Sequence, residues 1–307
     1  MNHVVNIMKT IAFIGSASGW GAQIRGTEKG PETFLSSGVL SSLKSPWVWK
    51  ETLFPVKSAL ASDLPPGLLT LPYIEDLCRR VSLSVEQALG DHQFPVVIGG
   101  DHVVAVGTWA GVVHHLRAKQ EFGLIWIDAH MDAHTMKTTP SEAYHGMPVA
   151  ALLGFGEPSI VNILEKGPIL NPHHICLIGV RSYEEGEAAL LKRLGVRIYF
   201  MQEVEDRGFD TVFQEALHLV KKGTKGFGLS IDLDAFDPQE APGVGTPTPL
   251  GLKAKEVLPT LSRIQDDPSF KTLEIVEYNP DRDKDSKTLL LMRDLLLNLT
   301  PKKGRSV

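Results

Sequence analysis

Short apolar runs of strand length recur along the chain, and most of them are continuously apolar rather than alternating. Such runs are typical of parallel strands that are covered by helices on both faces. The stretches between them have helical spacing, most clearly in residues 73–89. This alternation predicts an α/β fold, a three-layer α/β/α sandwich around a mostly parallel sheet. The predicted strands are residues 10–15, 95–98, 123–127, 175–180, 196–200, 226–231 and 272–277.

Length and composition favour a single domain. The chain has 307 residues, of which 43% are hydrophobic and 22% charged, and it contains no repeat or low-complexity linker. We therefore expect one catalytic domain over residues 1–307, with residues 302–307 as a disordered tail. Further packing helices are expected at residues 211–220, 254–264 and 288–299.

Charge and cysteine content exclude several classes of partner. A formal net charge of -5 offers no basic field for a nucleic acid. The leucine-rich segment 288–299 is shorter than the roughly 20 apolar residues of a membrane span. Cys78 and Cys176 have no metal-finger or redox spacing, and no export segment precedes residue 9. We expect reduced thiols, a cytoplasmic protein and only minor structure before residue 9.

Three segments place histidine or aspartate directly after apolar runs: residues 99–102, 128–132 and 230–234. Side chains at positions i and i+2 of an extended segment point to the same side, so each segment can direct its ligands to one point. The carboxyl ends of parallel strands also meet in the crevice where α/β sheets bind substrates. The candidate metal ligands are His102, Asp128, His130, Asp132, Asp232 and Asp234.

The donor set itself predicts two metal ions. Two imidazoles and four carboxylates without a thiolate favour Mn²⁺ or a similar ion over a sulfur-rich zinc site. Four carboxylates balance the charge of two dications. Asp101 and Asp237 are interpreted as structural, one near a turn and the other before Pro238.

On these motifs the chain resembles the arginase/agmatinase (ureohydrolase) family and is most similar to arginase. The resemblance extends from about residue 15 to residue 280 and includes the segments 26–32, 241–247 and 274–280. It implies an eight-stranded parallel sheet, two Mn²⁺ ions and a homo-oligomer, either a trimer or a hexamer. It also implies that one ion is held by His102, Asp128, Asp132 and Asp232, and the other by His130, Asp128, Asp232 and Asp234, with Asp128 and Asp232 bridging.

The resemblance further implies a mechanism. Two dications lower the pKa of a bridging water, and the resulting hydroxide attacks the guanidinium carbon. Glu277 pairs with the guanidinium, and Asp132 relays the proton of the hydroxide. His145 lies thirteen residues after Asp132 and matches the proton-shuttle histidine of the family.

The resemblance also implies which loop residues bind the tail of the substrate, the part that carries the α-amino and α-carboxylate groups. Ser141 matches a carboxylate contact of arginases, and Glu187 matches an acid near the α-amino group. His134 replaces the asparagine that binds the α-carboxylate, and Glu184 replaces a shorter aspartate. Because histidine can also donate to a carboxylate, L-arginine is the first choice of substrate, with L-ornithine and urea as products. The predicted substrate-binding residues are His134, Ser141, Glu184, Glu187 and Thr246.

Other activities fit the same metal motifs. An agmatinase, a guanidino-acid hydrolase or a formimidoylglutamase would share the ligand set and differ at the tail of the substrate. A catalytically silent metal-binding subunit would bind two ions without hydrolysis. An enzyme of the deacetylase type would bind a single zinc ion instead.

Overall fold

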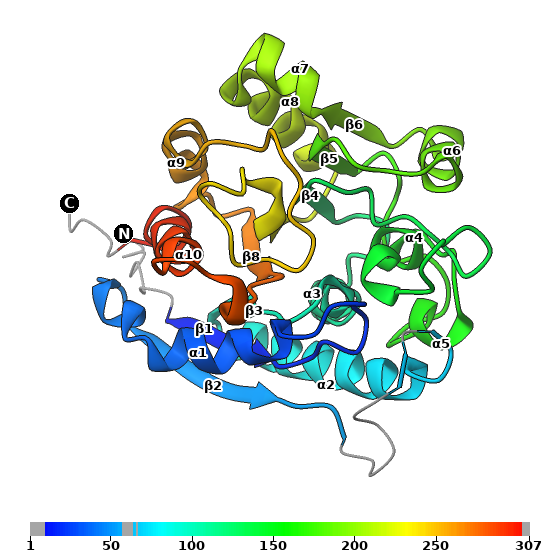
Figure 1. The fold of residues 1–307 in the computed structure, drawn as a ribbon, viewed down its shortest axis with the longest axis horizontal. Helices are drawn as coiled ribbons and strands as arrows, with labels where there is room; N and C mark the ends of the chain where they lie inside the picture. The colour runs from blue at the N-terminus through cyan, green and yellow to red at the C-terminus, as the bar shows by residue number, and fades with distance from the viewer. Residues whose placement is uncertain (1–9, 57–63, 66, 303–307) are drawn as a thin grey trace, which may run out of the picture.

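The computed structural model describes residues 10–56, 64–65 and 67–302. Its centre is one sheet of eight parallel strands in the order β2-β1-β3-β8-β7-β4-β5-β6 (Figure 1). The predicted fold class and strand number are confirmed. The strands are β1 (Ile11–Ser16), β2 (Trp47–Leu53), β3 (Phe94–Ile98), β4 (Gly123–Ile127), β5 (Ile175–Val180), β6 (Arg197–Phe200), β7 (Phe227–Asp232) and β8 (Phe270–Val276).

Helices cover both faces of this sheet (Figure 1). Neighbouring positions of β1 show why its sequence is continuously apolar: Ala12 and Ile14 pack in one core cluster, and Ile11 and Phe13 pack in the other. The first cluster contains α2 (Leu71–Gly90), α3 (Ala105–Leu116), α4 (Pro148–Leu152), α5 (Pro158–Val161) and α6 (Glu185–Leu194). The second contains α1 (Gly30–Ser36), α7 (Met201–Arg207), α8 (Phe209–Lys221), α9 (Ala254–Leu261) and α10 (Lys287–Leu299).

The edge strand β2 is absent from the strands predicted by residue pattern. It pairs only with β1, and most of its side chains are at least partly exposed. An edge strand tolerates polar residues such as Lys50 and Glu51, so it lacks the apolar run that marks the central strands. The glycine-rich segment 15–31 ends in a short 3-10 helix, η1 (Thr27–Lys29), and in the first residues of α1.

The expectations about the two ends of the chain fall almost entirely on residues that the structure does not describe. Residues 1–9 and, apart from Lys302, the predicted tail 302–307 lie outside the described residues. Cys78 and Cys176 are buried and unpaired. Within the described part of the chain, every helix is too short or too polar to cross a membrane.

Candidate metal centre

The candidate ligands lie where four adjacent strands end. Strands β3, β8, β7 and β4 are neighbours in the sheet, so the segments that follow them meet at its carboxyl edge. Asp232 is the last residue of β7, and Asp128 directly follows β4. His102 begins a short 3-10 helix, η3 (His102–Val104), and Asp234 lies in another, η5 (Leu233–Ala235). The predicted convergence of segments about 130 residues apart is therefore present in the fold.

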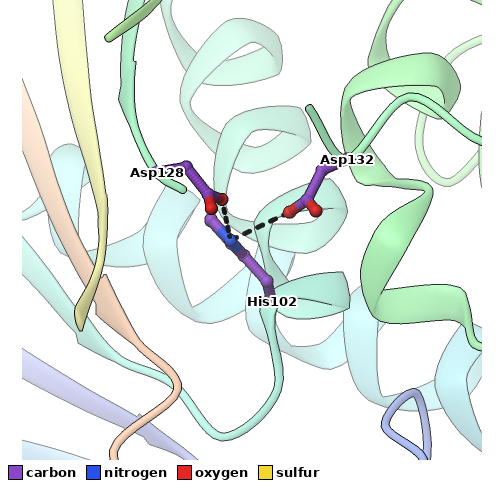
Figure 2. Close-up of side chains that lie close together, drawn as sticks. All are labelled: His102, Asp128 and Asp132. Atoms are coloured by element: carbon purple, nitrogen blue, oxygen red, sulfur yellow. Dashed lines mark ion pairs between the residues drawn. The ribbon is translucent and has the colours of Figure 1, made fainter. Parts of the chain in front are cut away.

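The first group surrounds His102. Its Nδ1 lies 3.2 Å from Asp128 Oδ2, 3.1 Å from Asp132 Oδ2 and 3.2 Å from Asp232 Oδ2. Figure 2 shows Asp128 and Asp132 pointing at this ring nitrogen from either side. His102 and Asp128 are fully buried, and Asp132 and Asp232 nearly so.

The second group surrounds His130 and uses the other oxygen of Asp128. His130 Nδ1 lies 3.4 Å from Asp128 Oδ1 and 3.2 Å from Asp234 Oδ2. Asp128 therefore faces both histidines, one with each carboxylate oxygen. This is the geometry of a residue that bridges two neighbouring cation sites.

The tautomer of His102 indicates that its Nδ1 faces a cation. Ser230 Oγ donates its proton to Glu274 Oε2 at 2.7 Å, so it must accept from His102 Nε2 at 2.9 Å. With its proton on Nε2, a neutral His102 turns the lone pair of Nδ1 toward three carboxylates. His102 Nδ1 and Asp132 Oδ2 are buried without a hydrogen-bond partner among the described residues. The residues therefore fit a divalent ion at this point.

The charges of the cluster lead to the same conclusion. Burial and the neighbouring Asp128 carboxylate raise the pKa of Asp132 to about 7. Burial and the carboxylates of Asp234 and Asp128 raise the pKa of Asp232 well above its usual value. Burial opposes protonation of His102, but the carboxylates of Asp128, Asp132 and Asp232 around its Nδ1 outweigh it and raise its pKa well above the usual value. Protons and metal ions therefore compete for the same atoms.

Residues that sequence reasoning did not select hold the ligands in place. Trp126 donates from Nε1 to Asp128 Oδ2 at 2.9 Å and stacks on the His102 ring at a centroid distance of 4.0 Å. Ser230 and Glu274 form the buried hydrogen-bond chain behind His102. Each of the three interrupts an apolar run inside a predicted strand. A side chain with a polar atom at such a position was the only sign in the sequence that it takes part in the site.

Glu277 and His145 lie beside the first group. Glu277 Oε1 accepts from the backbone N–H of His102 at 2.9 Å and lies 3.1 Å from His145 Nδ1. Glu277 Oε2 is buried without a hydrogen-bond partner among the described residues. Burial opposes protonation of His145, but the hydrogen bond to Glu277 raises its pKa to about 9.

Two of these residues have strained backbones. Asp132 has a φ of 50° and Glu277 a φ of 66°, in the left-handed region that residues other than glycine rarely occupy. Such strain concentrates at functional sites, where the surrounding structure holds it. The sequence pattern contains no sign of it.

The predicted substrate-tail residues occupy the loops around the centre. His134 Nε2 lies 2.9 Å from Glu184 Oε2 and 3.5 Å from Glu187 Oε1. Ser141 Oγ lies 3.3 Å from Thr139 Oγ1. Thr246 is placed differently from the others because its hydroxyl donates to Asp234 Oδ2 at 3.0 Å. That contact connects Thr246 to a candidate metal ligand.

Arg181 joins these loops to the centre and was also missed. It follows β5, and its guanidinium donates to five backbone carbonyl oxygens at 2.8–3.2 Å. A partly buried arginine with every donor engaged has a structural role, and an isolated Arg in a sequence gives no sign of it. The five acceptors are the carbonyl oxygens of Gly179, Asp234, Ala235, Thr248 and Pro249.

A parallel α/β sheet whose strand ends bear two His/Asp groups with a shared carboxylate defines a metal-dependent hydrolase. The Arginase family model matches residues 9–300. The arginase of Bacillus caldovelox is 38% identical over 285 residues, which cover 92% of this chain and 94% of that protein. The chain belongs to the arginase family, whose members are binuclear metal-dependent ureohydrolases acting on guanidino compounds.

Solved structures agree with this assignment. The crystal structure of the Bacillus caldovelox arginase superposes with a TM-score of 0.89 and 36% identity, covering 96% of this chain and 99% of that one. The formimidoylglutamase of Bacillus subtilis has a TM-score of 0.75 at 22% identity, covering 95% of this chain and 86% of that one, and shares only the fold. The predicted family is confirmed.

Proposed function

We propose that the protein hydrolyses L-arginine to L-ornithine and urea with two Mn²⁺ ions. One observation supports this most directly: Asp128 joins the two His/Asp groups, while Glu277 Oε2 is buried beside them and lacks a hydrogen-bond partner in the described part of the chain. A carboxylate oxygen at that position suits a planar cation such as guanidinium. The arginase name of the relatives supports L-arginine as the substrate.

The candidate ligands would hold the two ions in the sets given by the family resemblance. When bound, the ions supply an activated water as the nucleophile. Glu277 Oε2 orients the guanidinium, because its other oxygen is engaged by the His102 backbone N–H and by His145. His145 is protonated near neutral pH and gives its proton to the leaving amine. Asp132 takes up a proton of the nucleophile on Oδ1, because its Oδ2 faces His102 Nδ1 at the candidate ion position.

Manganese is proposed from the donors. Each group combines one imidazole nitrogen with carboxylate oxygens, and no cysteine belongs to either group. Such ligation suits Mn²⁺ better than a structural zinc site does. Metal analysis of protein loaded with Mn²⁺ is expected to give two ions per chain, whereas a single tightly held zinc ion would indicate the deacetylase type.

Product analysis tests the activity. Protein loaded with Mn²⁺ should release equal amounts of urea and ornithine from L-arginine, and chelator-treated protein should release neither. Formamide from a formimino substrate, without urea from arginine, would identify a formimidoylglutamase instead. Two bound ions without hydrolysis of any guanidino compound would identify a silent metal-binding subunit.

We also propose a cytoplasmic homo-oligomer, a trimer or a hexamer, as the family resemblance implies. The two buried, unpaired cysteines support a reducing compartment. Size-exclusion chromatography with light scattering should show three or six chains. A monomer at micromolar concentration would contradict the proposed assembly.

A further inference from the structure

His134 makes contacts that bear on substrate selection. The side chain is nearly buried, and its two ring nitrogens face different partners. Nε2 lies 2.9 Å from Glu184 Oε2, and Nδ1 lies 3.1 Å from Thr138 Oγ1. The sequence led us to expect that this histidine donates to a substrate carboxylate.

Hydrogen-bond chemistry leaves no free donor for that role. An ionised carboxylate only accepts, so the proton of the His134–Glu184 contact is on Nε2. In a neutral ring Nδ1 accepts from the Thr138 hydroxyl at 3.1 Å in place of the carbonyl oxygen of Thr135 at 3.4 Å, and in a protonated ring it donates to that hydroxyl. Both nitrogens are engaged in either state, so the expected contact with a substrate carboxylate is not available.

The groups around His134 are acidic. Glu187 accepts from the backbone N–H groups of Glu184 at 3.0 Å and Ala133 at 3.2 Å, which fixes its carboxylate behind the histidine. The Glu184 side chain is held by His134 Nε2 and by the backbone N–H of Glu187 in the capping box of α6, and 58% of it is exposed. Two carboxylates at this position favour a substrate ammonium and disfavour a substrate carboxylate.

Nearby cationic side chains are directed elsewhere. Arg181 donates to backbone carbonyl oxygens. Lys137 and Arg193 line a cavity of about 640 Å³ between the His134 loop and α6, and the lining of that cavity does not include His134, Glu184 or Glu187. Among the described residues, these contacts leave hydroxyl groups such as that of Ser141 as the neutral donors for a substrate carboxylate.

We propose that His134 is a positioning residue that fixes Glu184 as the acceptor for the substrate ammonium. Because both of its ring nitrogens are engaged, His134 itself does not bind a substrate carboxylate. The site then selects guanidino compounds by their amine and accepts guanidino amines as well as guanidino amino acids. This inference rests on the proposed ureohydrolase function and narrows its substrate class.

Ligand binding tests the proposal without turnover. Calorimetry on the Mn²⁺-loaded protein compares ornithine, putrescine, which lacks the carboxylate, and δ-aminovalerate, which lacks the α-amine. We expect putrescine to bind within about tenfold of ornithine and δ-aminovalerate to bind at least about 50-fold more weakly. Equal or tighter binding of δ-aminovalerate relative to putrescine would overturn the proposal.

Hydrolysis of the matching substrates separates this inference from the proposed function. The three substrates are arginine, agmatine and δ-guanidinovalerate. Urea from arginine and agmatine but not from δ-guanidinovalerate supports both. Urea from arginine and δ-guanidinovalerate but not from agmatine keeps the proposed function and rejects the inference. If no substrate yields urea, the proposed function fails, and the calorimetry still decides the inference.

Variants identify the residue responsible. In His134→Asn, the KM for agmatine should rise about tenfold while kcat changes less than about twofold, because Glu184 keeps only its capping-box contact and the reacting atoms are untouched. Glu184→Gln removes the charge at a largely exposed side chain and should raise the same KM even if the first variant folds poorly. The matched control is His114→Asn, which breaks a surface pair with Glu86 (2.9 Å) and should leave both constants unchanged. An unchanged KM for agmatine in Glu184→Gln would reject the proposal.

Discussion

The metal-ligand cluster and the predicted substrate-tail residues come within two residues of each other, at Asp132 and His134, yet they are built differently. The cluster lies at the ends of central strands, and its side chains are buried except that of His130, which is 26% exposed. The predicted substrate-tail residues lie on loops and at the start of α6, and they include the largely exposed Glu184. In the proposed function, the strand ends hold the metal ions and the loops recognise the tail of the substrate. We therefore expect substitutions in the loops to change substrate preference without loss of metal binding.

The largest effect is expected at the residue shared by both His/Asp groups. Asp128→Asn should reduce bound metal below two ions per chain and lower turnover at least about 1,000-fold, because it removes a bridging charge. Metal analysis and urea release measure both quantities. Asp91→Asn, at an exposed aspartate, serves as the control. Two bound metal ions per chain in Asp128→Asn would show that the metal-ligand cluster tolerates substitution, contrary to this comparison.

His145 lies between the two regions. We expect His145→Asn to keep both ions and to lower kcat about 100-fold, since it removes a proton donor rather than a ligand. Metal analysis and steady-state kinetics are the measurements. A fully active variant would reject the shuttle role, and loss of metal would instead place His145 with the ligands.

The same histidine gives the metal-free protein a pH-dependent stability. Its pKa is raised from 6.5 to about 9 by Glu277, against the opposing effect of burial. The contribution to folding is therefore complete below about pH 6.5 and disappears as the pH rises through about 9, with a ceiling of about 3 kcal/mol. Urea unfolding of metal-free protein at pH 6 and pH 9.5 measures it. His145→Asn should show a smaller difference between these pH values, and an equal difference would contradict the assignment.

A smaller effect is expected behind the ligands. Ser230→Ala removes the acceptor that fixes the His102 tautomer, so the affinity for Mn²⁺ should fall about tenfold. Competition with a metal-binding dye measures the affinity. An unchanged affinity would mean that the strand ends alone orient His102.

The smallest effect is expected at a predicted substrate-tail residue, Ser141. Ser141→Ala should raise the KM for arginine about threefold, with metal content and kcat unchanged, because it removes one neutral hydrogen bond. A change in metal content would contradict the separation of the two regions. Thr248→Ala, a loop hydroxyl without a predicted role, is the matched control.

The sequence predicted the fold class, the central strands and the convergence of the candidate ligands at one edge of the sheet, because these depend on local periodicity and on strand ends meeting at that edge. It did not predict β2 by residue pattern, since an edge strand needs no continuous apolar run. Ser230 and Glu274 were missed because two polar residues in separate strands reveal their contact only once the strands are paired. The role of His134 depends on Glu184, fifty residues away, and only the folded chain shows that contact.

Arg181 sets a practical boundary for redesigning selectivity. Its side chain anchors the segments around Asp234 and Thr248 to the end of β5, three residues before Glu184. We expect libraries that vary residues 182–187 to change the preference among guanidino substrates while this anchor remains. Substitution of Arg181 itself would release the loop that carries Thr246, whose hydroxyl donates to the candidate ligand Asp234. We therefore expect such a change to weaken metal binding.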